Sequence, residues 1–170
     1  MDERIKLIKA ELVLDIKYDI KIIVNMLADL ERRIEWDSNI VKVELLKKPA
    51  RHLAVYRYIF RNPCLFYKDR EFVDKCLVFQ DNATRDLYVY MTSVPNSIAA
   101  PDPSCIRAKN LISLYHIRVN PKKNITITLS YQMDFKFAED DQMLYVEYAH
   151  QLEYFTIELI TQLSKIGTLD

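Results

Sequence analysis

Between Ile40 and Phe135 apolar and polar residues alternate with a period of two over most positions. The residue types in this region are those that favour strands: valine, isoleucine, threonine, tyrosine and phenylalanine. In the last part of the region one side of the pattern is apolar from Ile125 to Phe135, while the other side carries Thr126, Thr128, Ser130, Gln132 and Asp134. A sheet with such an apolar face must have that face covered by another element.

Turn signals divide this region into six predicted strands, because prolines, asparagines and aspartates cluster between the alternating runs. The predicted strands are Ile40–Lys47, His52–Arg61, Glu71–Phe79, Leu87–Ser93, Cys105–Val119 with a break near Asn110, and Asn124–Phe135. Consecutive strands joined by short turns predict an antiparallel meander. A further strand is consistent with the alternation from Ile8 to Leu14, although Ile5, Ile8 and Leu12 also fit a helix.

Two helices are predicted from apolar residues at helical spacing. The first runs from a cap at Asp19 to Glu35, with Asp29 and Arg33 as an i,i+4 pair. The second opens at 139–141, closes at Lys165 before Gly167, and buries one stripe. That stripe consists of Tyr145, Tyr148, Ala149, Leu152, Phe155, Leu159, Leu163 and Ile166. The pattern predicts an α+β fold, a single domain over 1–170 in which a curved antiparallel sheet grips a long C-terminal helix.

The composition excludes several classes of function. Gly167 is the only glycine, so glycine-rich phosphate loops and dinucleotide fingerprints are absent. Balanced charges, 24 basic and 24 acidic residues, disfavour nucleic acid as a partner. Cys64, Cys76 and Cys105 form no CxxC pair, which indicates reduced thiols, and no metal or cofactor motif accompanies them. With no signal-peptide core and no long apolar run, we expect a cytoplasmic protein that contacts membranes only peripherally.

Four short motifs occur in an order that resembles the START (steroidogenic acute regulatory protein-related lipid transfer) domains. The motifs are Leu30–Asp37 with its closing Trp-Asp pair, Asp69–Val73, Ile106–Ala108 after a proline loop, and Leu129–Lys136. The resemblance implies a helix-grip fold that binds one phospholipid or sterol in a tunnel between sheet and last helix. It also implies exchange at membrane surfaces without enzymatic chemistry.

The chain departs from the family at three places. Glu71 replaces an aspartate, and Phe137–Ala138 replaces the usual glycine and proline. Only about 35 residues precede the Trp-Asp pair, where the family has a helix and three strands. Either the domain is trimmed and has an open sheet edge, or a partner chain or missing N-terminal segment completes the sheet.

The resemblance predicts which side chains face the tunnel. From the strands and the last helix they are Phe72, Cys76, Asn110, Ser113, Tyr115, Tyr131, Met133, Tyr148, Leu152 and Phe155. Cys76 stands where several family members carry a buried arginine, so Arg57 is the candidate for an interior cation that binds phosphate. The alternative places Arg57 on the outer face, with Tyr56 and Tyr58 inward.

The loop from Val94 to Ser104 matches the family's loop beside the tunnel mouth. Pro95, Pro101 and Pro103 stiffen it, and Ile98 gives it an apolar tip that can touch a membrane. The alternative is an ordinary hairpin connection.

Two other functions stay open. One is a cyclase or hydrolase on the same scaffold, which needs convergent acid, base or nucleophilic groups; His52, His116 and His150 do not form such a set. The other is a regulatory interaction module whose cavity is filled by aromatic side chains.

Overall fold

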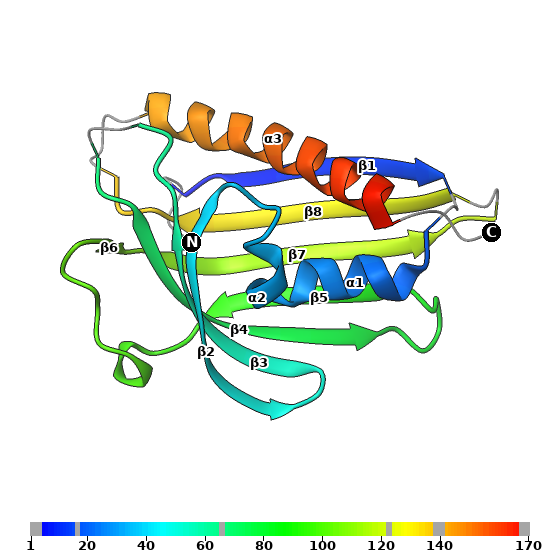
Figure 1. Cartoon of the computed structure of the whole chain (residues 1–170), viewed down its shortest axis with the longest axis horizontal. Helices are drawn as coiled ribbons and strands as arrows, with labels where there is room; N and C mark the ends of the chain where they lie inside the picture. The colour runs from blue at the N-terminus through cyan, green and yellow to red at the C-terminus, as the bar shows by residue number, and fades with distance from the viewer. Residues whose placement is uncertain (1–4, 16–17, 65–66, 122–123, 138–141, 167–170) are drawn as a thin grey trace.

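The fold is a curved sheet whose inner face is covered by helices (Figure 1). The computed structural model describes residues 5–15, 18–64, 67–121, 124–137 and 142–166, without the side chains of Asp15 and 142–145. Its elements are β1 (Leu7–Asp15), α1 (Ile20–Ala28), α2 (Leu30–Arg33), β2 (Ile40–Ala50), β3 (Leu53–Phe60), β4 (Arg70–Gln80), β5 (Leu87–Ser93), η1 (Asn96–Ile98), β6 (Ile106–Arg107), β7 (Lys109–Val119), β8 (Asn124–Asp134) and α3 (Gln142–Ile166).

Seven strands pair antiparallel in the order β1-β8-β7-β5-β4-β3-β2, so β1 and β2 are the two edges. The short β6 pairs in parallel with the start of β4. This arrangement confirms the predicted α+β helix-grip class and all six strands of the alternating region. The stretch around Ile8 to Leu14 is also a strand, since β1 pairs with β8 along its whole length.

The predicted break in the fifth strand lies at Ala108, two residues before the expected position. The chain changes neighbours there, because Ile106 pairs with Arg70 of β4 whereas Lys109 pairs with Asp134 of β8. A register shift follows between Asn110 and Ile112. This shift lets both Asn110 and Ser113 point inward, although their positions differ by three and strict alternation would place them on opposite faces.

The first predicted helix is two helices rather than one. Asp19 caps α1 as expected, accepting a hydrogen bond from the Lys21 N–H at 2.8 Å. The helix ends at Ala28 because Asp29 has an extended backbone, and α2 then starts at Leu30. The predicted ion pair between Asp29 and Arg33 is wrong: Arg32 lies 3.7 Å from Asp29, and Arg33 turns into the core.

The long helix α3 lies across the inner face beside β1 and β8 (Figure 1). Of its predicted stripe, Tyr148, Phe155, Leu159 and Leu163 are buried. Ile166 is 46% exposed, so its prediction as a packing residue is wrong; it occupies the last position of the helix. The predicted helix start at 139–141, Gly167 and the side chain of Tyr145 lie outside the described residues.

Substitution of Leu163 by alanine tests whether the C-terminal half of α3 anchors the helix. The side chain is 0% exposed, so its removal should lower the free energy of unfolding by about 2 to 5 kcal/mol. The matched control Ile166→Ala, on the exposed last turn, should stay within about 0.5 kcal/mol of wild type. Urea denaturation measures both, and equal losses would show that the packing assignment is wrong.

Candidate functional site

A cavity of about 50 Å³ lies between α3 and the sheet. Its walls come from β7 and β8 on one side and α3 on the other, and Arg33 of α2, Asn39 before β2 and Phe60 at the end of β3 complete the lining. The lining residues are Arg33, Asn39, Phe60, Ser113, Tyr115, Leu129, Tyr131, Met133, Phe135, Tyr148, Gln151, Leu152 and Phe155. The space is apolar on most of its surface, with a few polar groups converging on it, which is the usual composition of a ligand site.

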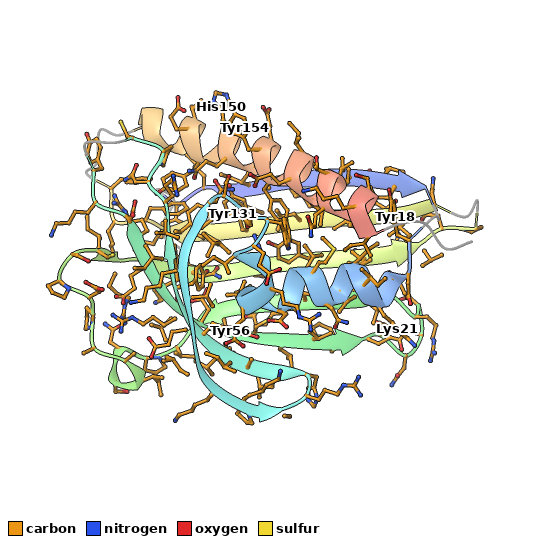
Figure 2. The ribbon with its side chains drawn as sticks, in the orientation of Figure 1. Tyr18, Lys21, Tyr56, Tyr131, His150 and Tyr154 are labelled. Carbon is orange, nitrogen blue, oxygen red and sulfur yellow. The ribbon has the colours of Figure 1, made fainter. Side chains whose placement is uncertain are left out.

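Seven of the predicted tunnel residues line this cavity: Ser113, Tyr115, Tyr131, Met133, Tyr148, Leu152 and Phe155. Figure 2 shows Tyr131 on the sheet beneath α3. Phe72 points inward but is enclosed by Tyr58 and Phe135, with ring centroids 5.3 and 6.0 Å away. Leu129 and Phe135 were not predicted as site residues, although they share the alternation of Tyr131 and Met133.

Arg57 lies on the outer face of the sheet, so the prediction that it is an interior cation is wrong. Its neighbours on β3, Tyr56 and Tyr58, take the buried inward positions. The Arg57 guanidinium instead forms an ion pair with Glu71, and its Nη2 lies 3.8 Å from Asp102. A phosphate in the cavity therefore has no access to Arg57.

The cation that lines the cavity is Arg33, which was predicted from the sequence only as the i,i+4 partner of Asp29. Its Nε donates to Asp37 at 2.7 Å, and its Nη1 donates to the Tyr115 hydroxyl at 2.8 Å. The guanidinium carbon lies 4.7 Å from the ring centroid of Phe155 on α3. Burial lowers the pKa of Arg33, but Tyr115 and Asp37 outweigh it and hold the pKa above the usual value. Arg33 thus joins α2, β7 and α3 as a fixed, charged donor.

Two residues that line the cavity each carry a buried polar atom with no hydrogen-bond partner among the described residues: the Tyr148 hydroxyl and Gln151 Oε1. Tyr148 is stacked on Phe135 at 4.0 Å between ring centroids, which holds the hydroxyl in place. The Gln151 Nε2 donates to the Arg61 carbonyl at 3.2 Å, which orients its amide. A buried polar atom without a partner is costly, so these two atoms are the polar groups of the candidate site that still have a hydrogen bond to make.

Asp74 forms the centre of a polar cluster on the same inner face. It accepts hydrogen bonds from the Tyr58 hydroxyl, the Ser93 hydroxyl and Asn110 Nδ2 at 2.8, 2.7 and 2.7 Å. Asn110 Oδ1 in turn accepts from Ser113, which reaches the cavity wall. Asn110, a predicted tunnel residue, therefore supports the wall without lining the cavity.

A second hollow, of about 300 Å³, lies between α1 and strands β3 and β4. The predicted tunnel residue Cys76 lines this hollow rather than the cavity under α3, together with Ala28 and Tyr56. Its thiol donates to the Ala28 carbonyl at 3.6 Å. Burial raises the pKa of the Cys76 thiol to about 12, so the sulfur is protonated and is a poor nucleophile.

The proline loop is fastened to the outer face through Glu71, whose side chain is 0% exposed. Glu71 binds Arg57, accepts from Arg107 Nε at 2.8 Å and accepts from the Asp102 backbone N–H at 3.1 Å. Burial raises the pKa of Glu71, but these donors outweigh it and hold the pKa below its usual range. Arg107 also donates to the Ala99 carbonyl at 3.2 Å. The charge cluster of Arg57, Glu71, Asp102 and Arg107 therefore holds the loop against the outer face of the sheet.

The tip of this loop is open to solvent. Pro95, Pro101 and Pro103 are exposed, and Ile98 in η1 is 39% exposed. A cleft of about 470 Å³ separates the base of the loop from the start of β7 and Lys136. Figure 1 shows the loop at the end of the molecule where α3 begins. The described residues contain no helix with the length and apolarity needed to span a bilayer, and no group of three metal-ligating side chains.

The sequence model of the START domain matches residues 2–138. The chain belongs to the START domain family. This assignment covers the sheet and α1–α2, and the helix α3 follows the matched segment. No curated protein sequence matched the chain.

Several solved structures share the fold. Human StAR-related lipid transfer protein 5 aligns with a TM-score of 0.81 and 17% identity, over 94% of this chain and 76% of its own. The human StarD13 (DLC2) lipid transfer and protein localization domain aligns with a TM-score of 0.73 and 18% identity, over 92% and 78%. The Zhui aromatase/cyclase from Streptomyces sp. R1128 aligns with a TM-score of 0.59 and 12% identity, over 95% and 93%.

The pH dependence of stability tests the buried position of Asp74. Burial raises its pKa to about 6, although Asn110, Ser93 and Tyr58 donate to it. The folded state then binds the proton more tightly than the unfolded chain does. The contribution of Asp74 to the free energy of unfolding is therefore complete below the unfolded pKa of 3.8 and is lost as the pH rises through about 6.

Asp74→Asn removes this titration. The free energy of unfolding of wild type relative to Asp74→Asn should fall by an amount on the order of 2 to 3 kcal/mol between about pH 4 and pH 8. Urea denaturation at each pH measures it, and other titrating groups cancel in the comparison. Parallel curves for the two proteins would contradict the assignment.

Proposed function

We propose that this START domain binds a single lipid, a phospholipid or a sterol, beneath α3 and carries it between membrane surfaces without chemical change. The observation that carries the proposal is the cavity under α3, whose mostly apolar and aromatic lining includes Tyr148 and Gln151, two residues with an unpartnered buried polar atom. Acyl or sterol carbon that leaves water for such walls gains roughly 0.8 kcal/mol per methylene, and the two polar atoms are left for a head group or hydroxyl.

Lipid entry requires α3 to move. The cavity of about 50 Å³ is far below the roughly 300 to 1,000 Å³ of typical ligand sites. The contacts that would be released on the inner side of α3 are stacking of Tyr148 on Phe135 and the bond from Gln151 to the Arg61 carbonyl. Near the middle of the helix, Glu158 accepts from the Ser38 N–H at 3.1 Å. A lipid that replaces the apolar contacts offsets much of the cost of opening.

The polar groups favour a ligand with a hydroxyl or phosphate oxygen. The Tyr148 hydroxyl can donate to either, and Gln151 Oε1 can accept from a hydroxyl. Arg33 lines the cavity, but its Nε and Nη1 donate to Asp37 and Tyr115, and Asp37 neutralises its charge. A head group that bears an unpaired charge is therefore not required for binding.

The residues that line this cavity do not include the convergent acid, base or nucleophilic side chains that an enzyme needs. Among its lining residues there is no histidine, cysteine or free carboxylate. The carboxylate of Asp74 is engaged by its three donors, Tyr58, Ser93 and Asn110, and Asp74 does not line the cavity. The enzyme alternative needs a nucleophile or an acid and base at the reacting atom, so binding without catalysis fits the cavity better.

Uptake of lipid from vesicles tests the proposal. Delipidated protein should take up fluorescent phosphatidylcholine, phosphatidylinositol or a fluorescent sterol, because the apolar walls accept hydrocarbon. Native mass spectrometry should show one lipid per chain. No uptake from any vesicle of this panel would refute lipid binding.

A side chain that fills the cavity should block this uptake. Leu152 is a half-buried residue of α3 on the cavity wall, so Leu152→Trp should reduce lipid uptake at least about tenfold while the domain stays folded. The matched control is Ile157→Trp, one and a half turns along the same helix, where the side chain is 60% exposed. Equal uptake by the two variants would show that the lipid does not lie under α3.

The charge cluster around Glu71 should control how fast the domain exchanges lipid with membranes. Glu71→Gln weakens the bonds to Arg57 and Arg107, so the loop 94–104 should exchange its amide hydrogens faster and transfer should depend less on salt. The control Glu44→Gln alters an exposed carboxylate that lies 3.8 Å from the same arginine. Mass spectrometry measures the hydrogen exchange. Unchanged protection of the loop in Glu71→Gln would show that the charge cluster does not hold the loop in place.

A further inference from the structure

The hollow beside α1, between that helix and strands β3 and β4, is separate from the cavity under α3. Its volume of about 300 Å³ is at the lower end of the range of roughly 300 to 1,000 Å³ for ligand sites. None of its lining residues also lines the cavity under α3. They lie on α1 and its C-cap, on the hairpin of β2 and β3, and on β4 (Figure 1). The lining residues are Val24, Asn25, Ala28, Asp29, Lys48, Arg51, His52, Leu53, Ala54, Tyr56, Cys76 and Val78.

Basic side chains form the hairpin side of the hollow. Four of the six residues from Lys47 to His52, where β2 turns into β3, are basic. Three of them, Lys48, Arg51 and His52, line the hollow and are exposed. These three side chains form no hydrogen bond or ion pair with the residues that the structure describes. Their donors are therefore available to an anion.

The α1 side of the hollow carries a carboxylate whose hydrogen bonding is incomplete. Asp29 caps the C-terminus of α1 through its backbone N–H, which donates to the Asn25 carbonyl at 3.0 Å. Its Oδ1 is buried and has no hydrogen-bond partner among the described residues. Its Oδ2 lies 3.7 Å from Arg32 Nε, in a pair whose arginine side chain is 78% exposed. Because an exposed pair of this kind is weak, the Asp29 carboxylate can still accept hydrogen bonds from a ligand.

We propose that the hollow beside α1 binds a phosphorylated polyol, either a free inositol phosphate or the same group as the head of a membrane lipid. The phosphate binds at the hairpin, where Lys48, Arg51 and the His52 imidazole supply donors. The hydroxyl groups donate to the Asp29 carboxylate and bond to the Asn25 amide on the α1 side.

The distribution of charge favours this orientation and this class of ligand. The Asp29 carboxylate repels a phosphate, and so does the C-terminal end of α1, which carries a partial negative charge. The same carboxylate attracts hydroxyl donors, which a simple anion lacks. A site with basic groups alone would bind any phosphate, whereas this hollow favours a phosphate that has hydroxyl groups beside it.

Isothermal titration calorimetry of the purified chain with inositol monophosphate and with inorganic phosphate tests the site. Inositol monophosphate should bind at least about tenfold more tightly, because its hydroxyls hydrogen-bond to a charged acceptor. Arg51→Glu should weaken this binding at least about tenfold, since it replaces a phosphate donor by a carboxylate. Asp29→Asn should bring the affinities of the two ligands within about threefold of each other.

Two control variants should bind inositol monophosphate like wild type. Lys21→Glu makes the same reversal of charge as Arg51→Glu, on an exposed residue of α1 that does not line the hollow (Figure 2). Leu152→Trp fills the cavity under α3, so unchanged binding would show that the ligand is not held there. Circular dichroism should show that every variant folds.

Vesicles distinguish the two sources of the ligand. Leu152→Trp is mixed with phosphatidylcholine vesicles that contain or lack phosphatidylinositol monophosphate, and cosedimentation is measured. Cosedimentation that requires the phosphorylated lipid and is lost when Arg51→Glu is added would support a membrane head group. Binding of inositol monophosphate without cosedimentation would support a free polyol phosphate. Binding of neither, equal affinity for inorganic phosphate, or a preference that persists in both Arg51→Glu and Asp29→Asn would overturn the proposal.

Discussion

The structure depends on keeping the apolar inner face of the sheet away from water. α3 covers this face over β8 and β1, while α1 packs on β4 and β5. Arg33, at the end of α2, connects the two helical segments that cover the sheet. It donates to Asp37 and Tyr115, and its guanidinium stacks over Phe155 of α3. A charged group at this place bridges elements that would otherwise meet only through apolar contacts, and it also supplies donors to the cavity. The same packing leaves only about 50 Å³ beneath α3.

The two elements that move in the proposed function, α3 and the loop 94–104, are held by different forces. α3 is held mainly by aromatic and aliphatic contacts, with Tyr148 stacked on Phe135. The loop 94–104 is held on the opposite face of the sheet by the hydrogen bond from the Asp102 N–H to Glu71 and by Arg107, which pairs with Glu71 and donates to the Ala99 carbonyl. An apolar ligand can replace the first set of contacts, and the charged surface of a membrane can compete with the second. In the proposed function, each element would therefore open in response to a different partner, the lipid for α3 and the bilayer surface for the loop.

The sequence predicted the parts of the structure that follow from periodicity. The strands and α3 were found because one face of each is apolar, and the order of short motifs identified the family. Residues whose roles depend on tertiary contacts were harder to predict. Arg57 and Arg33 both occur near aromatic residues in the sequence. Which of them is buried depends on which side of its strand or helix packs against the core, and this follows only from the tertiary structure. The break at Asp29, which turns Arg33 inward, has no periodic signal, and Cys76 and Asn110 required the register shift and the position of α1.

The central claim is that a lipid binds between α3 and the sheet. Photo-crosslinking with a lipid that carries a diazirine in its hydrocarbon, followed by mass spectrometric mapping of the adducts, tests it most directly. The account predicts adducts on Leu129, Met133, Leu152 and Phe155, which line the cavity from both sides. Adducts confined to the hollow beside α1 or to the outer face, or adducts that persist in Leu152→Trp, would contradict it.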